Sequence, residues 1–274
     1  MKAKPPLKSP AGASLFDWPA ETGRLAELAD RVVVRRKTLK RKKGRARVAA
    51  AATAALVLFG LWAVPYFRET RSLSVPAASR QSFGLPDGSM AELNSRTTVD
   101  TDFRYGRREV HLSQGEAFFS VVKDPSRPFI VVTPNGTVRV TGTQFDVRFE
   151  GNTLEVTLLE GSVRIDGGSP ASLKPGEQFD SAESSLRALT PSQLSDATAW
   201  RQGEFSFDGL TLEQSMARLS RYYGLEIQVA PQLAALRPGG RIPLTEFPAV
   251  IPALESVLQV RVIPAGPGYQ ILPQ

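Results

Sequence analysis

The hydrophobic and polar positions follow three different patterns along the chain. Residues 48–67, VAAAATAALVLFGLWAVPYF, include no charged side chain, and a helix of these 20 residues rises about 30 Å, the thickness of a membrane's hydrocarbon layer. Residues 80–190 alternate apolar and polar positions in short runs separated by glycines, which is typical of strands. Apolar residues after Pro191 recur at both helical and strand spacings. We therefore expect a mixed fold: a transmembrane helix, then an all-β domain, then a small α+β domain.

The central region carries the strand signals that define its fold class. Two β-rich runs, 129–132 and 137–140, are joined by a short connection with Asn135-Gly136, so we expect a hairpin there. The run 144–149, QFDVRF, places three apolar side chains on one face and three polar ones on the other, which indicates a half-buried strand. These features predict an antiparallel roll or sandwich.

A weak internal repeat lies in the same region. Residues 109–115, EVHLSQG, resemble residues 155–161, EVTLLEG, and each copy predicts a strand that runs into a glycine turn. His111 falls where the second copy has Thr157, on the strand face opposite its apolar neighbours. We therefore expect His111 to face solvent and to serve neither as a metal ligand nor as a base.

Residues 191–274 combine strand and helix patterns. A helix is expected between Thr211, which can cap it together with Gln214, and Gly224, which closes it. Further expected elements are strands near 204–207, 225–229, 241–244, 260–263 and 269–272 and a helix near 248–258. This order predicts a split β-α-β domain. The chain thus divides into residues 1–47, 48–67, 68–190 and 191–274.

The net charge of +7 is concentrated at the N-terminus. Residues 1–47 contribute +10, whereas residues 68–274 contribute −3. Because positive charge stays on the cytoplasmic side, we expect the N-terminus in the cytoplasm and the bulk of the chain across the membrane. No aromatic residue is interleaved with the cations before the apolar run, so they indicate a topology and lipid anchor rather than a nucleic-acid site. These cations are Arg35, Arg36, Lys37, Lys40, Arg41, Lys42, Lys43, Arg45 and Arg47.

Three alternatives to a retained membrane span stay open. The first is a buried core helix. The second is a cleaved signal peptide, although such a peptide has a short basic start and this apolar run begins after 47 residues. The third is a twin-arginine export signal, which residues 35–40, RRKTLK, loosely resemble. Cleavage by either export route would free the rest of the chain from the membrane.

The N-terminal segment has room for one amphipathic helix. Asp17 can cap it with Pro19 in the first turn, and an apolar stripe follows at helical spacing. One helix alone cannot bury that stripe, so it lies on the inner leaflet or docks against a partner protein, and both alternatives stay open. The candidate contact residues are Phe16, Trp18, Leu25, Leu28 and Val32.

The composition argues against catalysis. The chain has no cysteine and one histidine, which excludes thiolate metal sites, cysteine nucleophiles and sites with two imidazoles unless another chain supplies groups. Four carboxylates of the strand region, Asp87, Glu116, Asp146 and Glu160, have no recognisable pairing, and we expect them to be solvated at strand edges. We therefore expect no enzyme activity, no catalytic residue, no cofactor and no metal.

Several short motifs occur in order between residues 80 and 274. They include Leu85-Pro86-Asp87-Gly88-Ser89, Gly115-Glu116-Ala117-Phe118-Phe119, Thr141-Gly142-Thr143-Gln144-Phe145, Glu160-Gly161-Ser162-Val163, Trp200-Arg201 and Leu219-Ser220-Arg221-Tyr222-Tyr223-Gly224. In this order they resemble the FecR family of inner-membrane sigma-factor regulators, and the last part is similar to the short N-terminal domain of secretins and TonB-dependent receptors. We read the signature residues as structural: Asp87, Gly88, Gly115, Phe118, Thr141, Gly142, Thr143, Phe145 and Gly161.

The resemblance implies a function through contact rather than through chemistry. It implies an extracytoplasmic-function sigma factor as the cytoplasmic partner and the signalling domain of a TonB-dependent outer-membrane receptor as the periplasmic partner. It also implies a single-pass protein of the bacterial inner membrane with most of its mass in the periplasm. Family members typically carry several helices on the cytoplasmic side, whereas residues 1–47 have room for one. The alternative function is therefore a membrane-anchored envelope binding module without a sigma-factor output.

Overall fold

The computed structural model describes residues 31, 48, 50–59, 68–104 and 106–274. The chain forms two compact units, Met1–Val64 and Pro65–Gln274. In the first unit, residues 50–59 are helical, and the side chains of Leu56, Val57, Leu58 and Phe59 are exposed. No helix among the described residues is long and apolar enough to cross a membrane. The expected span over residues 48–67 extends past the described helix, and the candidate contact residues and the nine cations of the N-terminal segment lie outside the described residues.

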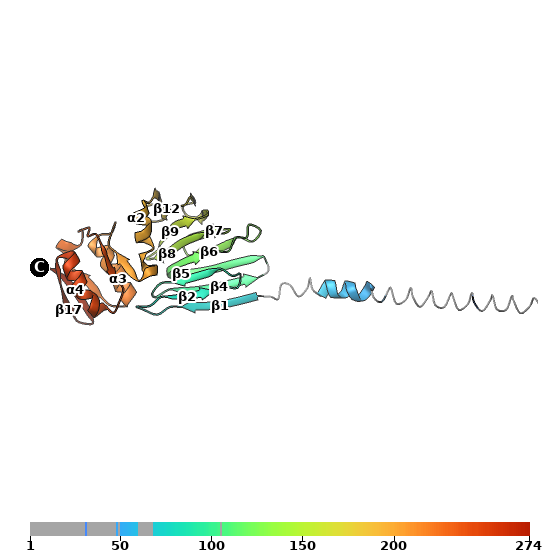
Figure 1. The fold of residues 1–274 in the computed structure, drawn as a ribbon, viewed down its shortest axis with the longest axis horizontal. Coiled ribbons are helices and arrows are strands. Elements are labelled where there is room, and N and C mark those ends of the chain that lie inside the picture. Colours follow the sequence, from blue (N-terminus) through green and yellow to red (C-terminus); the bar gives the residue numbers. More distant parts are fainter. Residues whose placement is uncertain (1–30, 32–47, 49, 60–67, 105) are drawn as a thin grey trace, which may run out of the picture. The chain divides into compact units, whose positions relative to one another are not determined.

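The second unit begins with an all-β domain, residues 68–188, hereafter the β domain (Figure 1). Its strands are β1 (Arg68–Ser74), β2 (Gln81–Gly84), β3 (Met90–Leu93), β4 (Thr98–Arg104), β5 (Arg107–Ser120), β6 (Phe129–Thr133), β7 (Gly136–Val140), β8 (Gln144–Glu150), β9 (Thr153–Glu160), β10 (Val163–Gly167), β11 (Ala171–Leu173), β12 (Glu177–Asp180) and β13 (Ser185–Ala188). The expected all-β class of this region is confirmed.

Two sheets share the long strand β5. One sheet has the order β1-β4-β5-β6-β7-β10-β11 and the other β2-β3-β5-β8-β9-β12-β13. Neighbouring strands are antiparallel except for β5 and β6, which are parallel. Strand β5 passes from one sheet to the other at Gly115, whose φ is 101°. A Cβ atom there would lie 2.7 Å from the Thr97 Cα atom, so only glycine fits this crossing.

The apolar faces of the two sheets pack against each other. One cluster of buried side chains runs from Val75 to Phe179 and draws on strands of both sheets. It includes the stacked rings of Phe119 and Phe145, whose centroids are 5.5 Å apart. Strands such as β6, with burial alternating along Phe129–Thr133, contribute every second residue, as a pleated backbone requires. The fold is therefore the two-layer β arrangement that the alternating pattern predicts.

Three local predictions for the β domain can now be compared with the structure. The Asn135-Gly136 hairpin is confirmed, since β6 and β7 pair antiparallel around it. His111 is exposed, as expected, and its Nε2 atom lies 2.7 Å from a carboxylate oxygen of Glu109. The glycine turn expected at Gly115 is wrong, because that residue lies inside β5 at the crossing between the sheets.

The second unit ends in a small α+β domain, residues 204–273, hereafter the C-terminal domain. Its elements are β14 (Glu204–Ser206), α3 (Leu212–Tyr223), β15 (Ile227–Val229), the 3₁₀ turn η3 (Pro231–Leu233), β16 (Arg241–Pro243), α4 (Phe247–Leu258), β17 (Val260–Ala265) and β18 (Gly268–Pro273). The expected cap of α3 is confirmed: Thr211 and Gln214 form a capping box, and Gly224 ends the helix with φ 67°. A second apolar cluster, from Phe207 to Ile271, forms its own core.

A short segment that the sequence pattern did not predict joins the two domains. It consists of α2 (Pro191–Ala197) and the 3₁₀ turn η2 (Ala199–Gln202), and we call residues 191–202 the strap. A capping box formed by Thr190 and Gln193 begins α2, and Gly203, with φ 80°, ends η2. The strap carries Trp200 and Arg201 to the outer face of the β domain.

Candidate functional site at the domain junction

The outer face of the second sheet is polar where the strap and the C-terminal domain cover it. Alternation turns Phe119 and Val147 inward to the core and leaves their neighbours facing outward. The register places the outward residues in two rows across the strands. The first row is Glu92, Phe118, Asp146, Thr157 and Gln178, and the second is Glu116, Arg148, Glu155 and Asp180.

The strap binds the first row through two side chains. The indole nitrogen of Trp200 donates a hydrogen bond of 3.2 Å to an Asp146 carboxylate oxygen. The Arg201 guanidinium holds Glu92 with two hydrogen bonds, of 2.6 and 3.2 Å, and lies 3.6 Å from the centre of the Phe118 ring. A bidentate ion pair over an aromatic ring fixes the position of an arginine in three dimensions. Contacts of both side chains therefore hold the strap on the outer face of the sheet.

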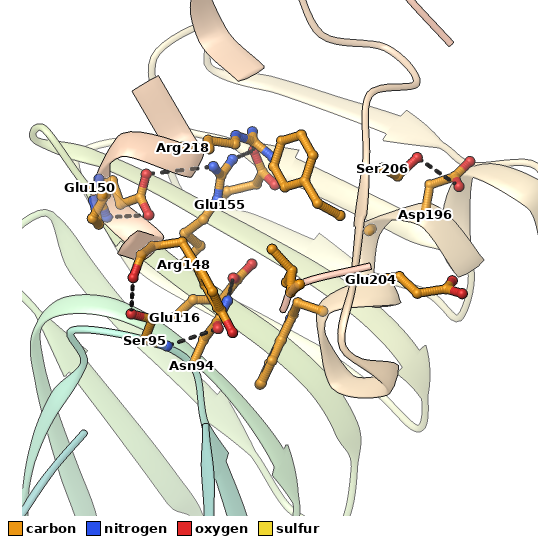
Figure 2. A pocket seen from close by; sticks show the side chains of 16 residues that line it. Asn94, Ser95, Glu116, Arg148, Glu150, Glu155, Asp196, Glu204, Ser206 and Arg218 are labelled. Atoms are coloured by element: carbon orange, nitrogen blue, oxygen red, sulfur yellow. Dashed lines mark hydrogen bonds and ion pairs between the residues drawn. The ribbon is translucent and has the colours of Figure 1, made fainter. Parts of the chain in front are cut away.

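The C-terminal domain reaches the second row and the end of β8 through two arginines of α3, one of which, Arg218, is labelled in Figure 2. Arg221 pairs with Glu150 at the end of β8, and Arg218 lies 3.6 Å from Glu155 on β9. Arg148 lies between the two carboxylates, paired with Glu155 and 3.6 Å from Glu150. The result is an alternating series of charges, hereafter the charge ladder: Arg221, Glu150, Arg148, Glu155 and Arg218.

A small cavity lies beside the charge ladder. Its volume is about 80 Å³, and it is lined by residues of both domains and of the strap, among them Asn94, Glu116 and Tyr222. Glu116 accepts a hydrogen bond of 2.6 Å from the Asn94 side chain. No described residue accepts a hydrogen bond from the buried Nε atom of Arg148. A cavity of this size exceeds the 10–15 Å³ or so that one water molecule needs, so the junction has room for water.

Burial and neighbouring charges shift the pKa values of three acidic groups in and beside the charge ladder. Burial raises the pKa of Glu116, against the lowering effect of Arg148. Burial also raises the pKa of Asp146, and the nearby Glu116 carboxyl acts in the same direction. Burial acts to raise the pKa of Glu155, but Arg148 and Arg218 outweigh it and the pKa is lowered. The junction therefore contains two carboxyl groups with a raised pKa, Glu116 and Asp146, beside one with a lowered pKa, Glu155.

The junction is suited to mechanical coupling between the domains. Backbone contacts add to it: the Tyr222 carbonyl of α3 accepts hydrogen bonds from the Ala78 amide, at 2.7 Å, and from the Ser95 hydroxyl, at 2.6 Å. Each apolar cluster draws its members from one domain, so the contact between the domains rests on polar groups. No group of three potential metal-ligating side chains occurs among the residues that the structure describes.

The signature residues occupy structural positions, most of them away from the junction. Asp87 is buried and binds Arg108, and Gly88 follows it in the same turn. The Thr141-Gly142-Thr143 loop packs on residues 121–124, since a Cβ atom on Gly142 would lie 2.6 Å from the Lys123 Cα atom. Phe145 lies in the core and Gly161 packs against Thr143. Phe118 is also buried, but on the outer face, where it supports Arg201.

Sequence reasoning was wrong about several carboxylates. The Asp87 side chain and Asp146 are each 4% exposed rather than solvated, and Glu116 is half-buried; Glu160 alone of the four is exposed, as expected. The run at β8 is not half-buried, because the strap and α3 cover Asp146 and Arg148 on its polar face. The charge ladder was missed, although Arg221 lies within a quoted motif. A detectable signal was the pair of arginines three residues apart on the polar side of α3.

Comparisons with known proteins agree with this architecture. Residues 71–164 match the family model described as FecR protein. No curated protein matches the chain. A crystal structure of a candidate anti-sigma factor from Parabacteroides distasonis ATCC 8503 is similar, with a TM-score of 0.65 and 25% identity over 75% of this chain and 100% of that one. A second crystal structure from the same organism, with the same description, gives a TM-score of 0.65 and 25% identity over 74% and 99% of the two chains.

The fold and these matches define a two-layer β domain with an appended α+β domain. The resemblance that the ordered motifs indicated is confirmed. The FecR match covers residues 71–164, which lie within the β domain.

Proposed function

We propose that this protein is a sigma-factor regulator that carries a signal from its C-terminal domain to its N-terminal segment. The observation that supports the proposal most is the extent of the structural similarity. The candidate anti-sigma factor matches over 100% of its own length, and 75% of this chain takes part in that match. The part of this chain that takes part in the structural match is longer than the β domain. The shared architecture therefore includes residues outside 71–164, the segment that matches the FecR model.

The proposal includes a single membrane span over residues 48–67. The exposed apolar side chains on the helix of residues 50–59 support it, because Leu56, Val57 and Phe59 are each more than 60% exposed. The cations before the run set the orientation with the N-terminus in the cytoplasm and bind anionic lipid. Protease added to spheroplasts of a bacterial host tests the topology. Digestion of residues 68–274 and protection of the N-terminus are expected, and protection of both parts would contradict it.

We further propose a partner for each side of the membrane. On the cytoplasmic side, Phe16, Trp18, Leu25, Leu28 and Val32 contact an extracytoplasmic-function sigma factor. On the periplasmic side, the C-terminal domain receives the signalling domain of a TonB-dependent receptor, since its strands and helices follow the split β-α-β order of that class of domain. The function requires contact and no catalysis.

Transcript profiling tests the regulatory function. The full chain is produced from an inducible promoter in the native organism lacking its own copy. We expect a defined group of promoters to change, and we expect the Trp18→Ala/Leu25→Ala variant to leave them unchanged. A Leu7→Ala variant, which changes an apolar residue outside the stripe, is the matched control. Unchanged transcripts with the wild-type chain at normal protein levels would contradict the proposal and favour the anchored binding module.

A further inference from the structure

The two domains of residues 68–274 are joined in two different ways. The strap lies on the first row of the sheet through Trp200 and Arg201. Arg80 reinforces it, because its guanidinium donates to the backbone carbonyl oxygens of Trp200, at 3.0 Å, and of Arg201. The C-terminal domain instead meets the second row through α3, whose contacts are the charge ladder and the carbonyl group of Tyr222. It also meets the strap, because Arg241 of β16 pairs with Asp196 of α2 at 2.7 Å.

The contacts of α3 are of the kind that break and re-form. The side chains of Arg218 and Arg221 are 32% and 31% exposed, and the pair between Arg218 and Glu155 is 3.6 Å long. The partner carboxylates, Glu155 and Glu150, are 16% and 21% exposed. Ion pairs that keep this much contact with water are worth little net free energy and weaken with salt. The two apolar cores are separate. Little buried apolar surface therefore becomes exposed to water when α3 leaves the sheet.

A candidate hinge residue lies between the strap and the first strand of the C-terminal domain. Gly203 follows the strap directly, with φ 80°, and β14 of the C-terminal domain begins at Glu204. Glycine allows the backbone to change φ and ψ there at low cost.

We propose that the C-terminal domain swings about Gly203 while the strap stays on the sheet, and that Arg218 and Arg221 form the clasp that, together with the pair between Arg241 and Asp196, holds the closed position. Opening uncovers Glu116, Arg148 and Glu155 on the β domain and frees α3 with its two arginines. The proposal concerns motion within residues 68–274 and holds whether or not the chain regulates a sigma factor.

Pulsed electron-spin distance measurements on the full-length protein test the swing. The chain has no cysteine, so Ser172→Cys in the β domain and Ser256→Cys in the C-terminal domain give one labelled pair at two exposed positions. We expect one closed distance at low salt and a growing longer component in 1 M NaCl, where the screening length falls to about 3 Å. We expect Arg218→Glu/Arg221→Glu to raise the open fraction roughly tenfold at low salt.

A matched control separates the clasp from charge in general. Arg237→Glu/Arg261→Glu reverses two exposed arginines of the same domain that take no part in the junction, and it should keep the wild-type distance. Circular dichroism confirms that each variant is folded. A folded Arg218→Glu/Arg221→Glu variant with the wild-type distance at both salt concentrations would overturn the proposal.

Fluorescence of Trp200 tests whether the strap stays in place. In a background with Trp18→Phe and Trp62→Phe, Trp200 is the one remaining tryptophan. Its side chain is buried, so we expect the same short-wavelength emission in the open variant as in the wild type. A shift to the emission of a solvated indole would overturn the hinge at Gly203, because the strap would then leave with the domain.

Discussion

Replacing Asp87 with alanine should strongly destabilise the β domain. The side chains of Arg108 and Asp87 are 1% and 4% exposed, and a nitrogen of Arg108 lies 2.9 Å from an Asp87 oxygen. Asp87 also accepts hydrogen bonds from the amide and the hydroxyl of Ser89, at 3.0 and 2.7 Å. The substitution leaves the Arg108 charge buried without its counter-ion.

The position of Arg108 explains why the pair matters. Strands β5 and β6 are parallel, so the chain between them must return and lie beside the start of β5. Arg108 holds this returning segment by donating to the carbonyl oxygens of Val122, Asp124 and Arg127, at 3.0, 3.3 and 2.7 Å. These carbonyls continue to stabilise the guanidinium in the variant. We therefore expect a cost of about 3 kcal/mol, the lower end of the 3–5 kcal/mol range for breaking a buried pair.

Urea unfolding followed by circular dichroism measures this loss. Asp100→Ala is the matched control, because Asp100 is an exposed carboxylate on β4, and its loss should change the free energy of unfolding by less than about 0.5 kcal/mol. A loss below about 1 kcal/mol for Asp87→Ala would refute the reasoning. It would mean that the carbonyl groups alone compensate the buried charge.

Three further predictions concern the sheet crossing and the junction. Gly115→Ala should prevent folding or cost several kcal/mol, whereas Gly106→Ala, also at positive φ but without a neighbour within 4 Å, should cost about 1 kcal/mol in urea unfolding. Arg201→Ala should lower the thermal midpoint and shift Trp200 emission to longer wavelength. Because burial raises the pKa of Asp146 above its ordinary value of 3.8, the stability that this group contributes should fall as the pH rises above that value. Asp146→Asn should reduce that fall in urea unfolding at a series of pH values, and an equal fall would contradict the assignment.

Local sequence signals predicted local structure well. The hairpin at Asn135-Gly136 and the capped helix from Thr211 to Gly224 depend on neighbouring residues, and both are present. His111 was placed correctly because its strand alternates clearly. The glycine turn predicted at Gly115 was wrong because glycine serves both turns and close backbone contacts. The partner in this close contact, Thr97, lies directly before another strand, β4.

The junction could not be predicted because its partners are far apart in the sequence. Asp146 and Trp200 are separated by 54 residues, and Glu92 and Arg201 by 109. Alternation correctly assigns Asp146 and Arg148 to the polar face of β8, but it does not show that another part of the chain covers that face. Prediction of the site would require knowledge of how the strap and α3 dock on the sheet.

Co-purification of the tagged full-length protein from membranes of the native organism tests the central claim most directly. Bound proteins are identified by mass spectrometry, with the Trp18→Ala/Leu25→Ala variant beside the wild type. The account predicts that a sigma factor is recovered with the wild-type chain and lost with the variant, while capture through residues 68–274 is unchanged. An envelope component recovered without any sigma factor would contradict the regulator and support an anchored binding module.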